Sequence, residues 1–148
     1  MVREIVGKPE GYITVSDVFG ITYLNVRNRS INDISGIEYF TSLQVLLCGN
    51  NQLTTLDVTN NIALKRLECI DNQLTALDLT NNPALTNLEC QYNRLSALDV
   101  TNNTALRYLD CTMNGMTQYD VIGWDTIGLV LGDTFLVDAK DRSDYRFV

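Results

Sequence analysis

The chain has 148 residues, of which 45% are hydrophobic and 20% are charged, a composition typical of one folded domain. Its formal net charge is −7 and its 11 Lys and Arg residues form no run. This charge argues against a nucleic-acid-binding protein and against adhesion to an anionic membrane surface. No apolar stretch of about 18 residues predicts a membrane span. Because the sequence has no His, it lacks the commonest general base and the commonest zinc ligand.

The N-terminal segment predicts a structural cap rather than a targeting signal. Residues 1–5 lack the apolar core of a signal peptide, so we expect either a cytosolic chain or a trimmed part of an exported protein. Within residues 11–20, a short helical turn is expected to begin at Thr14 or Ser16. Three apolar side chains of this turn are expected to cover the structure that follows: Val15, Val18 and Phe19.

A repeat of fixed length occupies the middle of the chain. Three copies of 21 residues, at 43–63, 64–84 and 85–105, share the frame LxxLxCxxNxLxxLDLTNNxA, and a partial copy begins at Leu106. Residues 21–42 form a 22-residue unit with a similar spacing of apolar residues. A fixed period in the twenties is typical of a solenoid, in which each repeat forms one coil.

Each repeat contains two similar phrases, LxxLxC and LxxLDL. In the first phrase, positions 1, 4 and 6 of the repeat point inward, and the alternation around positions 4 and 6 predicts a short strand. Successive coils would place these strands side by side, about 4.8 Å apart, in a parallel sheet. A 21-residue coil has no room for a three-turn helix, so the second phrase is expected to be extended or irregular. The phrases thus predict a first wall and a second wall of one flattened coil.

This pattern resembles bacterial leucine-rich-repeat proteins. The 21-residue copies resemble the short subclass in which two LxxLxLxxN-like phrases are nested in each repeat, and residues 21–42 resemble the longer, internalin-like repeat. The resemblance implies a leucine-rich-repeat solenoid of the α/β horseshoe class, here mostly β and irregular, with a parallel sheet of about five coils between N- and C-terminal caps. It also implies a repeat surface presented to another macromolecule, and a surface or secreted location.

We therefore expect a single leucine-rich-repeat domain over residues 1–148. Its expected parts are an N-cap at 1–20, the internalin-like repeat at 21–42, the 21-residue repeats at 43–122 and a C-cap at 123–148. In the C-cap, Trp124 and alternating apolar residues break the repeat and predict a hairpin-like structure with a turn at Gly132-Asp133.

Two rows of identical residues lie at the end of the first phrase and in the turn after it. The Asn at position 9 is expected to be buried and to satisfy backbone groups where the chain turns, in the row Asn51, Asn72, Asn93 and Asn114. The Cys at position 6 is expected to be a buried free thiol, in the row Cys48, Cys69, Cys90 and Cys111. Zinc sites use paired ligands that converge, and side chains in an in-register parallel stack point the same way, which fits disulfide geometry poorly.

A third row lies in the second phrase: Asp57, Asp78, Asp99 and Asp120. These carboxylates would repel one another unless hydroxyls or cations relieve the charge, and Thr59, Thr80 and Thr101 are placed to donate hydrogen bonds. A calcium site is the alternative, but Ca²⁺ requires six to eight oxygen ligands on a short loop. The stacked threonines also raise the possibility of an ice-binding face, which the intervening Asp residues would spoil. We expect a structural or solvated row, no metal and no cofactor.

The candidate binding surface is the outward side of the first wall. Its positions 2, 3, 5, 7 and 8 vary from coil to coil, whereas the outward second-wall positions repeat Thr, Ala, Asp, Thr and Asn. Tyr and Arg beside apolar residues are typical of protein-recognition surfaces, although solvent-facing positions can also simply drift. The candidate partner-binding residues are Tyr23, Leu47, Arg66, Glu68, Ile70, Glu89, Tyr92, Tyr108 and Asp110.

The sequence favours a protein that is not an enzyme. It contains no GxSxG motif, P-loop or GxGxxG motif, and the carboxylate row Glu68, Glu89 and Asp110 is not a catalytic pair without a cleft. Two functions remain. One is a protein- or glycan-binding module of a bacterial surface or secreted protein, which the family resemblance favours. The other is a compact acidic intracellular inhibitor that binds a basic surface of a target protein, which the free thiols and the absence of a signal peptide favour.

Overall fold

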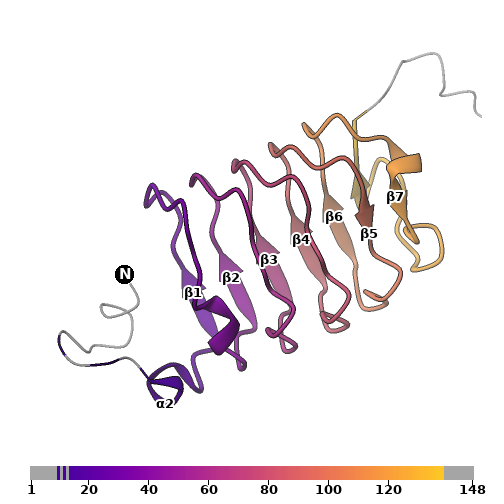
Figure 1. Ribbon diagram of the computed structural model, residues 1–148. Coiled ribbons are helices and arrows are strands. Elements are labelled where there is room, and N and C mark those ends of the chain that lie inside the picture. Colours follow the sequence, from indigo (N-terminus) through magenta and orange to yellow (C-terminus); the bar gives the residue numbers. More distant parts are fainter. Residues whose placement is uncertain (1–9, 11, 13, 139–148) are drawn as a thin grey trace, which may run out of the picture.

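The computed structural model describes residues 10, 12 and 14–138. Repeating coils stack side by side along one axis, and each contributes a short strand to one parallel sheet (Figure 1). The sheet order is β1-β2-β3-β4-β6-β8. The strands from the repeats are β1 (Tyr23–Asn25), β2 (Val45–Leu47), β3 (Arg66–Glu68), β4 (Asn87–Glu89) and β6 (Tyr108–Asp110). The predicted leucine-rich-repeat solenoid of about five coils is therefore confirmed.

The strands pair in register, so that equal positions of successive repeats face one another. The central residue of each strand is a Leu, in the row Leu24, Leu46, Leu67, Leu88 and Leu109. These residues are buried together with the other inward apolar residues of both phrases in one continuous core. Because one register slip would turn every inward Leu to solvent, the apolar spacing and the pairing support each other.

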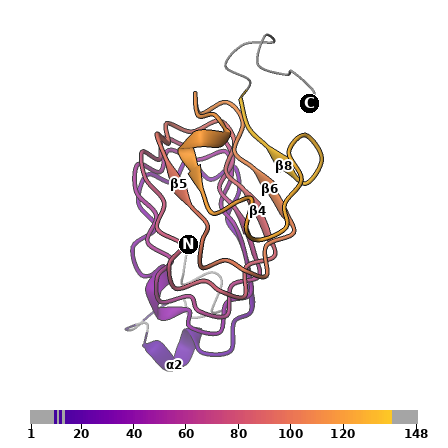
Figure 2. The same ribbon diagram turned by 90° about the vertical axis from the view of Figure 1, so that its right-hand side faces the viewer.

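The second wall faces the sheet across this core (Figure 2). It contains no long helix among the described residues. Its regular elements are β5 (Leu98–Asp99), which pairs in parallel with β7 (Val121–Ile122), and the 3₁₀ turns η1 (Ile37–Tyr39) and η2 (Gln118–Asp120). The remaining second-phrase segments are irregular, as the short repeat predicts.

The N-terminal turn α2 (Val15–Val18) begins after Thr14, whose backbone N–H donates to the Asp17 carboxylate at 2.7 Å. Val18 is buried in the core as predicted. The prediction is wrong for Val15 and Phe19, which are 55% and 70% exposed, because a four-residue turn directs only one of its side chains onto the first coil. Residues 1–9, 11 and 13 of the expected N-cap, including the segment compared with signal peptides, lie outside the described residues.

The C-terminal segment extends the sheet instead of folding back on itself. The expected turn is present, since Gly132 N–H donates to Phe135 C=O at 2.8 Å. However, β8 (Phe135–Leu136) pairs in parallel with β6, so the hairpin-like prediction is wrong. Phe135 stands opposite the central Leu109, is fully buried and packs on Trp124 with ring centroids 5.0 Å apart. An aromatic residue thus completes the core at this end. Residues 139–148 of the expected C-cap lie outside the described residues.

Within the described part of the chain, no helix has the length and apolar character needed to span a membrane.

Candidate functional site

The position-9 asparagines link each coil to the one before it. Asn72 Nδ2 donates to the carbonyl oxygens of Cys48 and Cys69, both at 3.1 Å, and its Oδ1 accepts from Leu53 N–H at 3.0 Å. Asn93 repeats these bonds one coil later. The side chain therefore satisfies backbone groups of two coils at once, which confirms the predicted ladder.

A second asparagine ladder lies on the opposite wall, and the sequence analysis missed it. Asn82 is fully buried, and its Nδ2 donates to the carbonyls of Val58 and Asn61, both at 3.0 Å. Asn61 and Asn103 occupy the same position and make corresponding bonds. The Thr-Asn-Asn motif with its 21-residue period was the available signal. Within each Asn pair the first residue is exposed and only the second points inward.

The cysteine row consists of free, buried thiols, as predicted. Cys48 Sγ donates to Glu68 C=O at 3.3 Å. Burial raises the pKa of Cys48 to about 12 and is also the main cause that raises the pKa of Cys111 to about 12. Reactive cysteines require a thiolate in a partly exposed, electropositive site, so this row serves as packing.

The second-wall aspartates are held by their own turns. Asp57 accepts from Thr59 N–H at 3.0 Å and from Thr59 Oγ1 at 2.6 Å, and these bonds lower the Asp57 pKa. Hydrogen bonds from Thr80 and Thr101 lower the pKa values of Asp78 and Asp99 in the same way. The predicted threonine contacts are confirmed. The described residues contain no group of three or more His, Cys, Asp or Glu side chains that could hold a metal ion.

The predicted partner-binding residues differ in accessibility. Tyr23, Arg66 and Tyr92 are exposed, and four others are half-buried: Ile70, Glu89, Tyr108 and Asp110. Two lie where the prediction did not expect them, because Leu47 is 5% and Glu68 only 2% exposed. Both occupy the outward strand position 5 and are paired in register. Their burial therefore results from side chains that lie over the sheet.

Arg27 is one of these covering side chains, and the sequence analysis did not select it. It reaches from the first coil past the second to the third, where its Nε donates to Glu68 Oε1 and its Nη2 lies beside Glu68 Oε2. Gly49 in the second coil leaves the room for this contact. A Cβ at Gly49 would lie 2.8 Å from Glu68 Oε1 and 3.2 Å from the Ile70 carbonyl oxygen.

Arg66 continues this network toward the fourth coil. Its Nη2 donates to Glu89 Oε1 at 2.8 Å and lies 4.0 Å from Glu68 Oε2. Four charged side chains of the first four coils thus neutralise one another on the sheet face: Arg27, Glu68, Arg66 and Glu89.

The last two coils present a different face. Desolvation raises the pKa of Tyr108, with smaller contributions from the carboxylates of Asp110 and Glu89. Asp110 accepts from Thr112 N–H at 3.1 Å and from Thr112 Oγ1 at 2.8 Å. Among the described residues Asp110 makes no ion pair, so its carboxylate is not neutralised by a cation in the way that Glu68 and Glu89 are.

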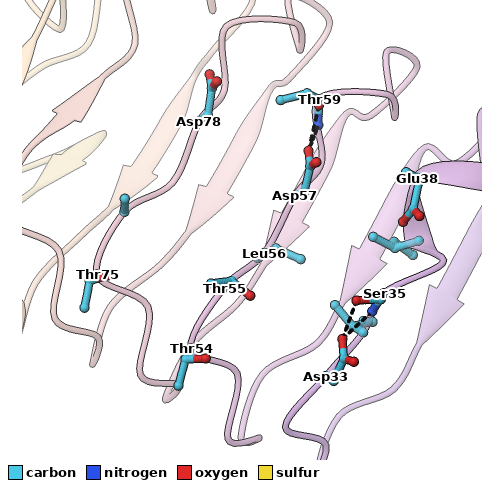
Figure 3. A pocket seen from close by; sticks show the side chains of 13 residues that line it. Asp33, Ser35, Glu38, Thr54, Thr55, Leu56, Asp57, Thr59, Thr75 and Asp78 are labelled. Carbon is cyan, nitrogen blue, oxygen red and sulfur yellow. Dashed lines mark hydrogen bonds between the residues drawn. The ribbon is translucent and has the colours of Figure 1, made fainter.

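The second wall carries a groove that the sequence analysis did not predict (Figure 3). It has a volume of about 470 Å³ and lies between the first three coils. Four carboxylates line it: Asp33, Glu38, Asp57 and Asp78. Each accepts a hydrogen bond from its own turn, as Asp33 does from Ser35 N–H at 2.8 Å and Glu38 from Gly36 N–H at 2.8 Å. The groove is acidic and hydroxyl-rich, with its carboxylates held in place.

The parallel sheet, the asparagine ladder behind it and the inward Leu and Cys rows define a leucine-rich-repeat solenoid. No family model matches the chain. A stretch of 41 residues is 46% identical to internalin J of Listeria monocytogenes, which is 28% of this chain and 4% of that protein.

Solved structures show the same relationship over more of the chain. The functional domain of internalin J, described as including a cysteine ladder, is 36% identical with a TM-score of 0.57, covering 69% of this chain and 27% of that one. An internalin of Listeria monocytogenes, InlF, is 24% identical with a TM-score of 0.65, covering 76% of this chain and 41% of that one. The chain is therefore an internalin-like leucine-rich-repeat protein, and it covers at most 41% of the length of these relatives.

Proposed function

We propose that this chain is a non-catalytic module that presents the first wall of its coils to a protein partner. The observation that carries the proposal is that the outward residues vary between coils on the first wall but not on the second. The outward first-wall positions differ between coils and expose Tyr23, Arg66 and Tyr92, whereas the outward second-wall positions repeat. Tyr and Arg concentrate at the centres of protein interfaces, and an invariant wall is what a scaffold requires.

The proposed contact residues are the accessible members of the predicted set: Tyr23, Arg66, Ile70, Glu89, Tyr92, Tyr108 and Asp110. Leu47 and Glu68 would act from beneath, by holding Arg27 and Arg66 in place. The similarity to internalins supports a role at a bacterial surface or in secretion. One domain with an N-cap at 1–20 and a C-cap at 123–148 is part of the same proposal.

The test is a random-peptide display library panned on the immobilised wild-type chain. Peptides that recognise the first wall should lose roughly 30-fold or more in affinity, about 2 kcal/mol, against Arg66→Glu or Tyr92→Ala. A matched second-wall set, Thr54→Ala, Asp78→Asn and Thr101→Ala, should leave their affinity unchanged. Loss in the second-wall set without loss in the first-wall set would mean that the binding face has been assigned to the wrong wall.

The alternative, an acidic inhibitor of a protein with a basic surface, is favoured by the second-wall groove and by the net charge of −7. Binding through that groove would weaken steeply with salt and would be lost in the second-wall set. An export signal or surface anchor in the complete reading frame would argue against an intracellular inhibitor.

A further inference from the structure

Position 8 of every coil adopts a left-handed backbone conformation. The five residues and their φ values are Asn28 (55°), Asn50 (55°), Asp71 (51°), Tyr92 (57°) and Met113 (57°). This turn follows the strand and keeps the backbone N–H directed at the next coil, as Tyr92 N–H donates to Thr112 C=O at 3.1 Å. Asn and Asp are the non-glycine residues that tolerate this region best. The first three coils therefore carry the residue types that the backbone favours.

The fourth and fifth coils carry residues that this backbone disfavours. Tyr92 is 54% exposed and Met113 is 56% exposed, so neither gains full burial in return for the strained conformation. Strain at a surface position that a better-suited residue could relieve is a signature of a functional site. The usual alternative, that the side chains are required for core packing, does not fit residues with half of their surface in water.

The two side chains form one surface feature. They occupy the same position of adjacent coils, whose strands are about 4.8 Å apart, and Ile70 precedes position 8 in the third coil. We call Ile70, Tyr92 and Met113 the apolar strip. A carboxylate stands at each end: Asp71 is exposed in the third coil, and Asp138 accepts from Met113 N–H at 2.7 Å.

The surroundings of the strip are acidic. Positions 7 and 8 of these three coils contain no Lys or Arg, and Asp110 lies nearby on the last strand from the repeats. Arg94, the next cation in the sequence, comes after the Asn93 that links the coils. In the first coils the position-7 cation Arg27 is instead bound to Glu68. Charge complementarity therefore favours a cationic occupant at the strip.

We propose that Tyr92 and Met113 anchor an apolar side chain of a partner peptide segment that carries Lys or Arg on both sides of it. The proposal rests on the proposed function and narrows the first-wall contact to its C-terminal coils. Tyr supplies a large contact area at low entropic cost, Met adapts to varied apolar shapes, and Asp71 and Asp138 are placed to attract the flanking cations.

The proposal predicts a trade-off between stability and binding. Tyr92→Asn and Met113→Asn put the residue of the first coils into the same turn, so their melting temperature should be unchanged or up to about 4 °C higher. The reverse change, Asn50→Tyr in the second coil, should lower the melting temperature. A clear fall in the double variant Tyr92→Asn/Met113→Asn would show that these side chains are packing residues and would overturn the proposal.

Binding is tested with a random-peptide display library panned on the wild-type chain and counter-selected on the double variant. Enriched peptides should carry an aromatic or aliphatic residue between Lys or Arg residues, and should bind the double variant at least tenfold more weakly. Acidic peptides, or peptides that bind the double variant equally well, would overturn the proposal. Peptides lost with Arg66→Glu and retained by the double variant would overturn it while leaving the proposed function intact. Enrichment that no first-wall variant affects would overturn both.

Discussion

Both walls of the coil use asparagine side chains to connect neighbouring coils, but the asparagines of the first wall make more hydrogen bonds than those of the second. On the first wall, the asparagine amide donates to carbonyls of two coils and its oxygen accepts a backbone N–H, as in Asn93. On the second wall, Asn61, Asn82 and Asn103 make the donor contacts, while their Oδ1 atoms are buried without a hydrogen-bond partner. On both walls, the asparagine amides therefore donate hydrogen bonds to backbone carbonyls of neighbouring coils. Only on the first wall, whose outer surface varies, does the side-chain oxygen also accept a backbone N–H.

A variant at Gly123 should break the second wall alone and with the largest effect. Gly123 has a φ of 85°, and a Cβ there would lie 2.7–2.9 Å from Thr101 Oγ1, Cα and N. Gly123→Ala should therefore cost about 3 kcal/mol or more in the free energy of unfolding, measured by urea denaturation.

Gly115→Ala is the matched control. Its φ of 77° imposes similar strain, but nothing lies within 4 Å of the added Cβ, so the expected cost is about 1 kcal/mol. Equal losses for the two glycine variants would show that backbone strain, rather than the close contact with Thr101, limits the second wall.

The two ladders can be compared directly by removing one amide from each. Asn93→Ala leaves Leu74 N–H without its partner and removes one of the two amide donors from each of two carbonyls, those of Cys69 and Cys90. It should cost about 3 kcal/mol, because it loses two hydrogen bonds of about 1 kcal/mol each and leaves one buried N–H unsatisfied. Asn82→Ala removes two donor hydrogen bonds from carbonyls that keep their backbone N–H partners, and it should cost about 2 kcal/mol, about 1 kcal/mol for each bond.

The control for both is Thr75→Ala on the outer surface of the second wall, expected within about 0.5 kcal/mol of wild type. The measurement is the free energy of unfolding in urea. A loss of unfolding free energy as small as that of Thr75→Ala would refute the ladder interpretation for the wall concerned.

Removing Arg27 should destabilise the first wall, because it breaks the ion pair that joins the first coil to the third. Arg27→Ala leaves the buried Glu68 carboxylate with only Arg66, 4.0 Å away, and should cost about 2 kcal/mol, somewhat less than the loss of a partner from a fully buried pair. Because the contact is shielded from solvent, salt should not restore the lost stability. Arg94→Ala, at an exposed position, should change stability by at most about 0.5 kcal/mol. Similar losses at both positions, measured by urea denaturation, would indicate a general charge effect.

The cysteine row should give the first wall a sensitivity to alkali that the second wall lacks. Cys48 and Cys111 have their pKa values raised to about 12 by burial, whereas an unfolded thiol ionises near pH 8.5. The stability from these neutral thiols is fully present below about pH 8.5 and is lost as the pH rises toward 12. Urea denaturation as a function of pH measures this decline.

The control replaces the buried thiols by the side chain that the second wall uses at the equivalent inward position, as in Val58 and Val100. Cys48→Val/Cys111→Val should cost at most about 1.5 kcal/mol per site at neutral pH and should flatten the alkaline decline, because these two thiols no longer ionise. An unchanged decline would place its origin in other groups. The native chain should also fail to react with thiol reagents until it is denatured.

The sequence by itself determined the features that depend on spacing along the chain. The 21-residue period set the coil length, and the inward Leu and Cys positions predicted the strands, their parallel register and the buried thiols. The position-9 asparagines could be assigned because the strand before them fixes where the chain must turn. These features were predictable because alternation in a strand sets the direction of each side chain.

Only the tertiary structure decided which outward side chains are accessible and how the C-terminal segment packs against the last coil. Glu68 points outward in its strand, yet Arg27, 41 residues earlier, buries it because Gly49 lies between them. Asn60 and Asn61 are the same residue type, and only the contacts with the preceding coil show that Asn61 is the one that points inward. Phe135 joined the parallel sheet because the last coil offered an open edge over the core. The direction in which a side chain points is a local property of the backbone, whereas its burial depends on which side chains of neighbouring coils lie over it.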